Sequence, residues 1–441
     1  MADKMGTGEP LRVGVAGLGT VGASVISILD KRADRLDLRT GRRMRVTDVA
    51  ARSRSKDRGV DLAGMNWHDD AVALAREAEI DVFVELIGGE DGPAKAAVEA
   101  ALSRGLPVVT ANKALLAAHG LALAKLAEEA GGALLFEAAV AGGIPAIKTL
   151  REGLRANAIE LVYGVLNGTC NYILTRMEND GLAFDDVLRQ AQELGYAEAD
   201  PTFDVGGFDT AHKLSILASL AFGIEPDGEA VSCEGIEQVT AEDIAAAAQL
   251  GYRIKLLGIA RRTKDGIEQR VHPTMVPLAS SVASVAGVTN AVAMRGDAVG
   301  DVFMSGPGAG GAATASAVIA DLCHVAIGAG GPAFGLPVAQ LRPFRPAPAQ
   351  AHEGGFYVRM LVRDRVGVFA DLARHMADEG VSLRSITQGD ANPGEDGEAR
   401  KTIVLVTHDI EEPRVRAATE AAEREGYVIG GARLIRIEAT I

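Results

Sequence analysis

A glycine-rich turn near the start of the chain most constrains its fold. Residues 11–16 read LRVGVA and are followed by GLGTVG, which places Gly17, Gly19 and Gly22 ahead of a segment with helical apolar spacing. The first two glycines permit a tight turn and close approach of a pyrophosphate, and the third permits close packing of the helix on the strand. The pattern predicts a dinucleotide-binding strand, turn and helix, although a glycine turn without a ligand has the same letters.

Strand-like and helix-like segments continue to alternate through the first third of the chain. Apolar runs typical of buried strands occur at 44–53, 81–88 and 106–111, and helix-like runs at 71–79 and 93–105 lie between them. Such alternation is typical of a doubly wound parallel sheet. We therefore expect an α/β fold in which residues 1–135 form a Rossmann-type NAD(P)-binding domain.

The rhythm of the sequence then changes, and two further domains are expected. Residues 136–335 carry longer strands and helices, and we expect an α+β domain for substrate binding, catalysis and dimerisation. Within it, a glycine loop and small-residue helix at 306–330 are expected to pack back on the first domain. Residues 336–354 are rich in proline and predict a stiff linker. The order βαββαβ in residues 355–441 predicts a ferredoxin-like regulatory domain.

An acidic segment, GYAEADPTFDVGGFDTAHK at residues 195–213, gathers four carboxylates beside one lysine where an apolar helix begins. Asp209 and Lys213 are four residues apart, so a helix would place them on one face. The turns before them can bring Glu198 and Asp204 toward that face. An ammonium surrounded by carboxylates suits binding of a small amino acid and transfer of a proton. A solvated acidic loop followed by an exposed lysine explains the same letters, so this segment alone leaves both interpretations open.

Two cationic positions follow predicted strands of the first domain. After the second strand the chain offers Arg52, Arg54 and Lys56, where an NAD site usually has an acidic residue. Cations there favour the 2′-phosphate of NADP(H) over NAD(H), unless they are ordinary surface charges. The sequence TANK puts Lys113 at the carboxyl end of a strand, the edge at which open α/β sheets bind ligands. Lys113 can therefore approach the nicotinamide, although a helix-capping turn with an exposed lysine is equally consistent.

A further turn combines a lone carboxylate with glycines and a proline. This run is FEAAVAGGIP, and its carboxylate is Glu137. Carbonyl oxygens exposed by such a turn, together with one carboxylate, suit a hard cation. A purely structural turn is the alternative.

Charge and cysteine content exclude several classes of function. The chain has 45 Lys and Arg against 59 Asp and Glu, and its net charge of −14 argues against nucleic acid or an anionic membrane as a partner. Cys170, Cys233 and Cys323 lack metal-site spacing and do not suggest a disulfide framework. The chain begins without an apolar signal core, and no apolar run reaches membrane-spanning length. We expect a soluble cytoplasmic protein that acts on a small molecule.

Six motifs together carry a family resemblance. GLGTVG, TANK, EAAVAGGIP, LNGTCNYIL, GYAEADPTFDVGGFDTAHK and SGPGAGG occur in the order seen in homoserine dehydrogenases. Over essentially its whole length the chain resembles the monofunctional members that end in an ACT domain. The resemblance implies NAD(P)-dependent interconversion of L-homoserine and L-aspartate 4-semialdehyde, on the route to threonine, methionine and isoleucine. It also suggests a homodimer or homotetramer and L-threonine as a feedback ligand, with a purely structural ACT domain as the alternative.

The resemblance also implies roles for particular residues. Lys213 would exchange the proton of the substrate oxygen, Lys113 would lie near nicotinamide and substrate, and Asp204 would support the lysines. Glu198 and Asp209 would bind the amino-acid substrate. The residues implied for cofactor binding are Gly17, Gly19, Thr20, Val21, Gly22, Arg52, Lys113, Gly195 and Gly306. The implied ligands of a sodium ion are the side chain of Glu137 and the carbonyls of Val140, Gly142 and Ile144.

Two other functions are weighed against this one. Aspartate-semialdehyde dehydrogenase needs an activated thiol. Cys170 is the only cysteine near a motif, and no histidine is close to it in sequence. A non-catalytic amino-acid sensor would show a degenerate cofactor site, whereas the glycine loop and Lys113 are both present.

Overall fold

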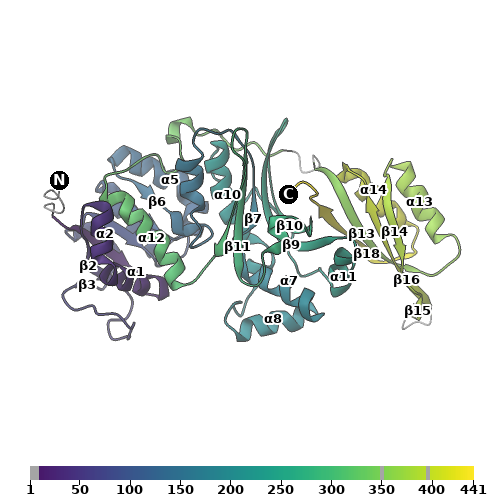
Figure 1. Cartoon of the computed structure of the whole chain (residues 1–441), viewed down its shortest axis with the longest axis horizontal. Coiled ribbons are helices and arrows are strands. Elements are labelled where there is room, and N and C mark those ends of the chain that lie inside the picture. The colour runs from purple at the N-terminus through teal and green to yellow at the C-terminus, as the bar shows by residue number, and fades with distance from the viewer. Residues whose placement is uncertain (1–8, 348–351, 394–397) are drawn as a thin grey trace.

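The computed structural model describes residues 9–347, 352–393 and 398–441. It shows three parts in a row along the long axis of the molecule (Figure 1), with the N-terminal part at one end and the C-terminal part at the other. Within the described ranges, no helix is long and apolar enough to cross a membrane.

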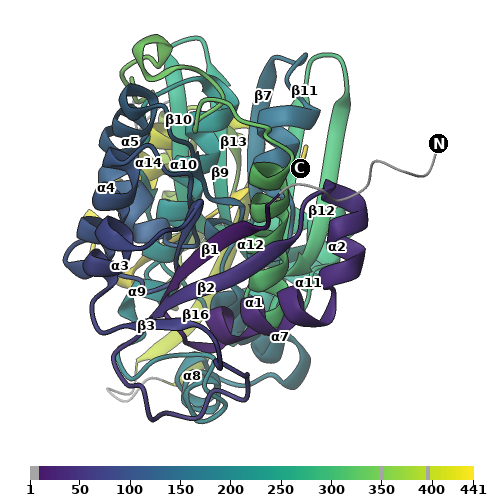
Figure 2. The ribbon, with the colours of Figure 1, turned by 90° about the vertical axis from the view of Figure 1, so that its left-hand side faces the viewer.

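The N-terminal part is built on a six-stranded parallel sheet in the order β3-β2-β1-β4-β5-β6. This is the doubly wound order that the alternating sequence pattern predicts, so the Rossmann-type fold is confirmed. Viewed from this end of the molecule, the first sheet lies in front of the long strands of the middle part (Figure 2). Its strands are β1 (Leu11–Ala16), β2 (Met44–Ala50), β3 (Asn66–His68), β4 (Val82–Glu85), β5 (Val108–Thr110) and β6 (Leu134–Leu135).

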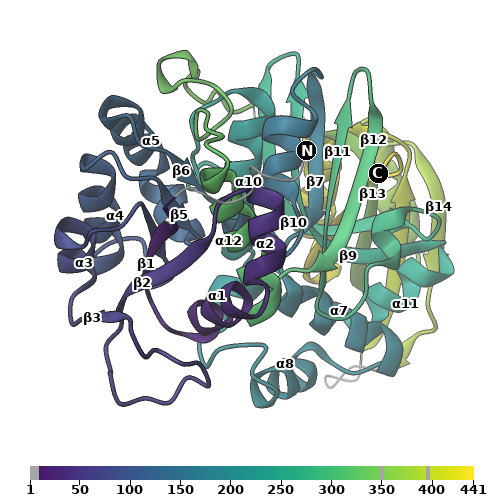
Figure 3. The same ribbon diagram turned by 60° about the vertical axis from the view of Figure 1, so that its left-hand side comes forward.

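Helices cover both faces of this sheet (Figure 3). On one face, α12 returns from the middle part of the chain and lies beside α1, where Val318 joins the apolar core that contains Val13 and Val25. The helices of this face are α1 (Thr20–Lys31), α2 (Ala33–Thr40) and α12 (Gly311–Ala326). Those of the opposite face are α3 (Ala71–Glu77), α4 (Pro93–Ser103) and α5 (Lys113–Ala130).

The strands of the middle part continue into those of the C-terminal part as one sheet, with the main order β12-β11-β7-β9-β10-β18-β13-β16-β14. The junction is a short parallel pairing of β10 with β18, at Thr274 with Arg436 and Met275 with Ile437. The sequence predicts a separate regulatory module after a linker, whereas the structure joins its sheet to the middle sheet. The strands of the middle part are β7 (Ile159–Val165), β8 (Ser232–Cys233), β9 (Tyr252–Thr263), β10 (Gly266–Pro277), β11 (Thr289–Gly296) and β12 (Gly300–Pro307).

Helix α10 connects the first two parts, because it packs on α5 as well as on β7 and β9. Most of its residues are buried, as expected for an apolar helix between two layers. The α-helices of the middle part are α6 (Ala146–Lys148), α7 (Gly168–Asp180), α8 (Phe184–Glu193), α9 (Thr202–Val205), α10 (Phe208–Phe222) and α11 (Ala241–Gln249). Its other helical turns are η1 (Glu137–Ala139), η2 (Thr149–Gly153) and η3 (Ser281–Ser284).

The C-terminal part has the expected ferredoxin-like arrangement, with strand order β18-β13-β16-β14. Its core contains Val358, Leu405 and Val415. The strands are β13 (Glu353–Arg363), β14 (Leu383–Gln388), β15 (Asn392–Pro393), β16 (Ala399–Thr407), β17 (Ile410–Glu411) and β18 (Val428–Ile437), and the helices are α13 (Val368–Asp378) and α14 (Glu412–Arg424).

The predicted linker, residues 336–354, is described on both sides of a gap. A helical turn, η4 (Val338–Gln340), begins it, and Arg342 and Pro346 then form bridges with Ile224 and Ile267 of the middle part. Residues 348–351 of the predicted linker lie outside the described residues.

Candidate active site

The acidic segment forms a short helix, a glycine turn and the start of α10. Helix α9 ends at Val205 and is capped by Gly206, and Gly207 adopts a left-handed conformation with φ of +89°. A side chain on Gly207 would be strained, since its β-carbon would also lie 2.8 Å from Cγ1 of Val271. The turn directs the chain into α10, with Asp209 in the first turn of the helix and Lys213 one turn later.

Asp209 lies between two lysines. Its Oδ2 accepts a hydrogen bond from Nζ of Lys213 at 2.6 Å, and its Oδ1 lies 3.0 Å from Nζ of Lys113. Nζ of Lys213 also donates to the carbonyl of Leu166 at 2.7 Å. Burial alone would raise the pKa of Asp209, but the two ammonium groups outweigh it and hold the pKa well below its usual range. The carboxylate therefore stays ionised and fixes both lysines.

Asn167 links the two carboxylates of the segment. Its Nδ2 donates to Oδ1 of Asp204 at 2.8 Å and to Oδ2 of Asp209 at 2.9 Å. Burial raises the pKa of Asp204; the bond from Asn167 lowers it and the charge of Asp209 raises it again, so the net shift is upward. Asn167 has no predicted role. Its signal is positional, because it follows strand β7 and caps α7 by accepting a bond from the backbone of Cys170.

The carboxyl ends of β4 and β5 place Lys113. Asn112 caps α5, and its Nδ2 donates to the carbonyl of Gly89 at 2.6 Å. One residue into the helix, Lys113 emerges at the junction with α10. Thr110, at the end of β5, donates to the buried carboxylate of Glu85 at the end of β4, at 2.5 Å. These bonds hold the sheet edge from which Lys113 reaches Asp209.

The remaining residues of the segment are more exposed. Glu198 is exposed, and among the described residues its carboxylate has no hydrogen bond or ion pair. Gly195 follows α8 in a left-handed conformation with φ of +74° and open space around it. The interpretation as a wholly solvated loop is wrong for Asp209 and Lys213, whose side chains are only 6% and 11% exposed. Substrate binding by Glu198 and cofactor binding at Gly195 stay predictions.

The glycine turn before α1 has the geometry that a pyrophosphate needs. Gly17 has φ of +102°, and a β-carbon there would overlap the carbonyl of Leu86. A β-carbon on Gly22 would overlap the carbonyl of Gly17, so close packing of helix on strand requires this glycine. Gly19 caps α1 and has no atom within 4 Å of the position of a β-carbon. The first-turn amides, including those of Thr20 and Val21, can therefore receive an anion.

The loop after β2 carries exposed cations and no carboxylate through Lys56. Arg52 is exposed, two residues after the strand ends. The guanidinium carbon of Arg54 lies 6.0 Å from the centre of the Trp67 ring, within the range of a cation–π contact. Arg52 therefore stays the predicted partner of a 2′-phosphate.

Glu137 is a buried carboxylate held by a helix start. Its two oxygens accept the backbone N–H groups of Ile147 at 3.0 Å and Lys148 at 2.8 Å. Burial raises the pKa of Glu137 to about 7, and the nearby Asp321 contributes to the rise. A cation at this carboxylate would offset the cost of its buried charge. The donor set thus fits a small hard cation.

The turn that follows Glu137 supplies carbonyl oxygens rather than further acids. Ala141 and Gly142 have φ of 56° and 54°, two consecutive left-handed residues between Val140 and Ile144. Gly306 lies against this turn, since a β-carbon there would be 3.4 Å from Cγ1 of Ile144. The described residues contain no group of three or more His, Cys, Asp and Glu side chains suited to a metal ion. A cation here would therefore depend on one carboxylate and backbone carbonyls.

Cys170 is buried beneath the acidic segment. Its Sγ donates to the carbonyl of Asp204 at 3.2 Å, and burial raises the pKa of the thiol well above its usual range. Because the thiolate is the nucleophile, this position does not suit thioester chemistry.

Comparison with known proteins assigns each part of the chain. The family model for the NAD-binding domain of homoserine dehydrogenase matches residues 17–137. The family model for homoserine dehydrogenase matches residues 145–323, and the one for the ACT domain matches residues 356–426. The homoserine dehydrogenase of Pseudomonas aeruginosa is 44% identical over 436 residues, covering 98% of this chain and 99% of that protein.

Solved structures agree. A homoserine dehydrogenase from Thiobacillus denitrificans superposes with a TM-score of 0.91 at 44% identity, covering 98% of this chain and 99% of that one. A hyperthermophilic archaeal homoserine dehydrogenase in complex with NADPH gives a TM-score of 0.63 at 26% identity, covering 73% of this chain and 99% of that one. These matches exclude the thiol-dependent dehydrogenase and the non-catalytic sensor. The chain belongs to the homoserine dehydrogenase family of NAD(P)-dependent oxidoreductases, which serves aspartate-family amino-acid biosynthesis.

Proposed function

We propose that Lys213 is the proton donor and acceptor in the homoserine dehydrogenase activity of this chain. The observation that carries the proposal is the position of Asp209 between Lys213 and Lys113, where the nucleotide-binding and catalytic parts meet. The nicotinamide cofactor supplies or accepts the hydride at the carbonyl carbon of the substrate. The protein must then deliver a proton to the substrate oxygen or remove it, and a buried, oriented ammonium suits that task.

The hydrogen bonds of Lys213 leave room for the substrate. An ammonium has three N–H groups. Two of those of Lys213 donate to Asp209 and to the carbonyl of Leu166, and the third is left for the substrate oxygen. Lys113, with a single ion pair to Asp209, can approach the nicotinamide and the substrate together. Asp204 supports this network through Asn167. Asp209 and Glu198 bind the α-ammonium of L-homoserine or L-aspartate 4-semialdehyde.

The cofactor and metal assignments extend this proposal. Gly17, Gly19 and Gly22 shape the phosphate turn, and Arg52 selects NADP(H) over NAD(H) by pairing with the 2′-phosphate. The proposed cofactor-binding residues also include Thr20, Val21, Gly195 and Gly306. A sodium ion is held by the side chain of Glu137 and the carbonyls of Val140, Gly142 and Ile144, as the buried carboxylate and left-handed turn support.

The C-terminal ACT domain is the regulatory part of the enzyme, and L-threonine is the proposed ligand. The turn into α13 contains Gly367 at φ of 98°, so the chain reverses there before the helix begins. This turn is where we expect the amino acid to bind. We also propose a homodimer or homotetramer that works in the cytoplasm.

A steady-state assay tests these points together. Purified protein is mixed with L-aspartate 4-semialdehyde and either NADPH or NADH, with and without L-threonine, and cofactor oxidation is followed by absorbance. We expect turnover with NADPH, a lower kcat/KM with NADH, and inhibition by threonine. If neither NADPH nor NADH supports turnover, the proposed activity is refuted. If the rate does not change across a threonine titration, threonine is not a feedback ligand.

A further inference from the structure

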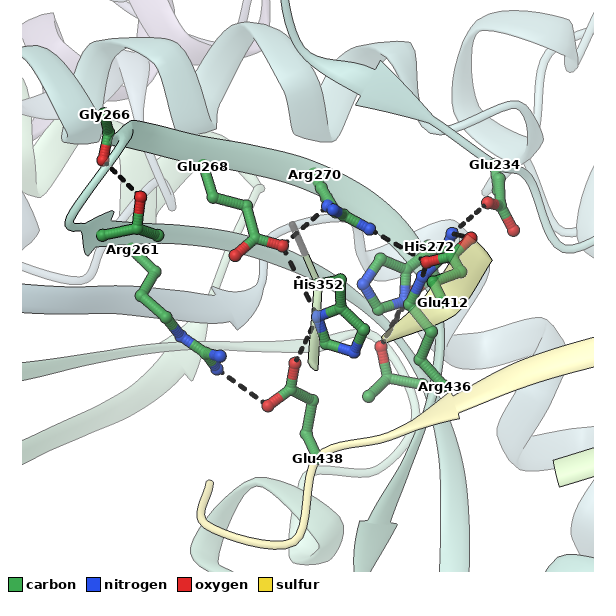
Figure 4. A network of polar contacts seen from close by, with 12 residues as sticks. Glu234, Arg261, Gly266, Glu268, Arg270, His272, His352, Glu412, Arg436 and Glu438 are labelled. Carbon is green, nitrogen blue, oxygen red and sulfur yellow. Dashed lines mark hydrogen bonds and ion pairs between the residues drawn. The ribbon is translucent and has the colours of Figure 1, made fainter. Parts of the chain in front are cut away.

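A network of charges joins the ACT domain to the catalytic part (Figure 4); it is buried at Arg436 and Glu412, and the side chain of Glu234 at its margin is 34% exposed. Arg436 of β18 is 6% exposed, and its guanidinium binds both oxygens of Glu412 at 2.7 and 2.8 Å. The same guanidinium donates to Oε1 of Glu234 at 2.8 Å, across the boundary between the two parts. Arg270 of β10 binds Glu412 at 3.1 Å from the catalytic side. Removing one partner of a buried ion pair leaves the other charge uncompensated, so the geometry of the buried part of the network depends on each of its members.

Glu234 lies on a short segment that packs on the catalytic turn. Its backbone N–H donates to the carbonyl of Val271 at 2.7 Å, and the N–H of Ile236 donates to the carbonyl of Val205 at 2.9 Å. Gly235, between these two residues, packs so closely on the turn that there is no space for a side chain: a β-carbon there would lie 2.5 Å from the carbonyl oxygen of Val205. A shift of residues 234–236 therefore requires a shift of the turn.

That turn carries the acidic groups of the candidate active site. Val205 directly follows Asp204, and Gly207 lies two residues before Asp209 in the first turn of α10. The turn is closely confined, because the side chain of Val271 leaves no space for a β-carbon at Gly207. A displacement of about 1 Å in a catalytic group is enough to slow a reaction by roughly a hundredfold.

We infer that Glu234 is a positioning residue: its ion pair with Arg436 of the ACT domain holds the segment that sets Asp204 and Asp209 in place. The inference rests on the proposed function, because it assumes that these carboxylates bind substrate and orient the lysines. It makes the catalytic turn sensitive to how the ACT domain sits on the catalytic part. The dinucleotide turn lies in the N-terminal part, where the carbonyls of Leu86 and Gly17 confine it.

The test compares Glu234→Gln with a matched control in the full-length enzyme. Glu234→Gln removes the charge and keeps the shape, and Arg436 retains Glu412 as its partner. The control is Glu438→Gln, because Glu438 lies at the other end of the same network, where it pairs with Arg261 of β9 at 2.8 Å and approaches His352 at 4.0 Å rather than residues 234–236. For each variant, kcat and KM for L-homoserine, the Kd of NADPH and the temperature of unfolding are measured.

We expect Glu234→Gln to lower kcat/KM for L-homoserine roughly three- to tenfold. The Kd of NADPH should stay within about twofold, and Glu438→Gln should leave both quantities within about twofold. Glu234→Asp, which keeps the charge, should restore much of the loss. The inference is overturned if Glu234→Gln matches Glu438→Gln, or if NADPH binding falls with substrate turnover as in general loosening. Lys213→Met, measured in parallel, separates the two ideas, because its full activity would refute the proposed role of Lys213 alone.

Discussion

Replacement of Lys213 by methionine removes the proposed proton carrier and leaves its neighbours paired. Asp209 keeps Lys113 at 3.0 Å and Asn167 at 2.9 Å, and the carbonyl of Leu166 keeps Nδ2 of Asn290 at 2.9 Å. The variant therefore loses two hydrogen bonds from a charged donor without leaving a buried acceptor unpaired. We expect the free energy of unfolding to fall by at most about 3–6 kcal/mol, the size of two hydrogen bonds to a charged group.

The effect on the reaction is measured separately from the effect on stability. Loss of a positioned acid–base group lowers turnover by roughly a hundredfold to ten-thousandfold. Lys213→Arg is the informative companion, since arginine keeps the positive charge beside Asp209 but does not give up a proton near neutral pH. We expect Lys213→Arg to be as inactive as Lys213→Met while unfolding closer to the temperature of the parent protein.

The assay is initial-rate reduction of L-aspartate 4-semialdehyde and oxidation of L-homoserine, together with thermal unfolding of each variant. Lys125→Met is the control, because Lys125 forms the same four-residue spacing with Glu129 on α5, but with both side chains 65% exposed. It should match the parent in both measurements. If a folded Lys213→Met keeps a kcat within about tenfold of the parent, the loss is below the range of acid–base catalysis and the reasoning is refuted.

Three further predictions concern the cofactor, the metal and the thiol. Arg52→Gln should lower kcat/KM for NADPH by about tenfold or more and leave that for NADH nearly unchanged, since a charged hydrogen bond is lost with only one cofactor; an equal fall with both would contradict the role of Arg52. Burial raises the pKa of Glu137 to about 7 in the folded protein, so between pH 4.5 and 7 the folded chain holds a proton that the unfolded chain releases. The contribution of Glu137 to the free energy of unfolding should therefore fall as the pH rises from 4.5 to 7. Compared with Glu137→Gln, the parent protein should lose at most about 3 kcal/mol of unfolding free energy over that pH range in choline buffers, and less in sodium buffers. Thermal unfolding measures both losses, and identical curves in the two buffers would exclude sodium. Cys170→Ser should keep activity within about twofold, because serine can donate the same bond to the carbonyl of Asp204; loss of activity in a folded variant would show that the thiol is needed.

The sequence predicts those features that depend on local spacing. Alternating strands and helices identify the parallel sheet, and the glycines at 17 and 22 are explained by carbonyls that leave no space for a side chain. The spacing of four residues between Asp209 and Lys213 is enough to predict their ion pair on α10. The alternation and the four-residue spacing involve residues of one segment, so their cause is visible in the letters, whereas the carbonyl that requires glycine at 17 is that of Leu86, on another segment.

Contacts between distant segments have no such signal. The pairing of Lys113 with Asp209 depends on the packing of α5 on α10, and the bridge through Asn167 depends on where β7 ends. The pairing of β10 with β18 involves two residues on each strand, too few for any periodicity to reveal. Residue spacing also does not show how far a turn carries each side chain. For this reason the sequence does not reveal that Glu198 is exposed while Asp204, in the same segment, lies near the lysines.

The two carboxylates joined by Asn167 differ in a way that divides the work at the site. Asp209 is held ionised by two ammonium groups, whereas burial and the neighbouring charge of Asp209 raise the pKa of Asp204. Environments that push two such groups apart commonly mark distinct roles in one reaction. Asp209 already has three donors in Lys213, Lys113 and Asn167, which leaves one acceptor site for the substrate ammonium. The ammonium therefore gains a second charged partner at Asp204, whose partly buried carboxylate has a single amide partner. We therefore propose that Asp204 contributes to substrate binding as well as to support of the lysines, and Asp204→Asn should raise the KM for L-homoserine more than it lowers kcat.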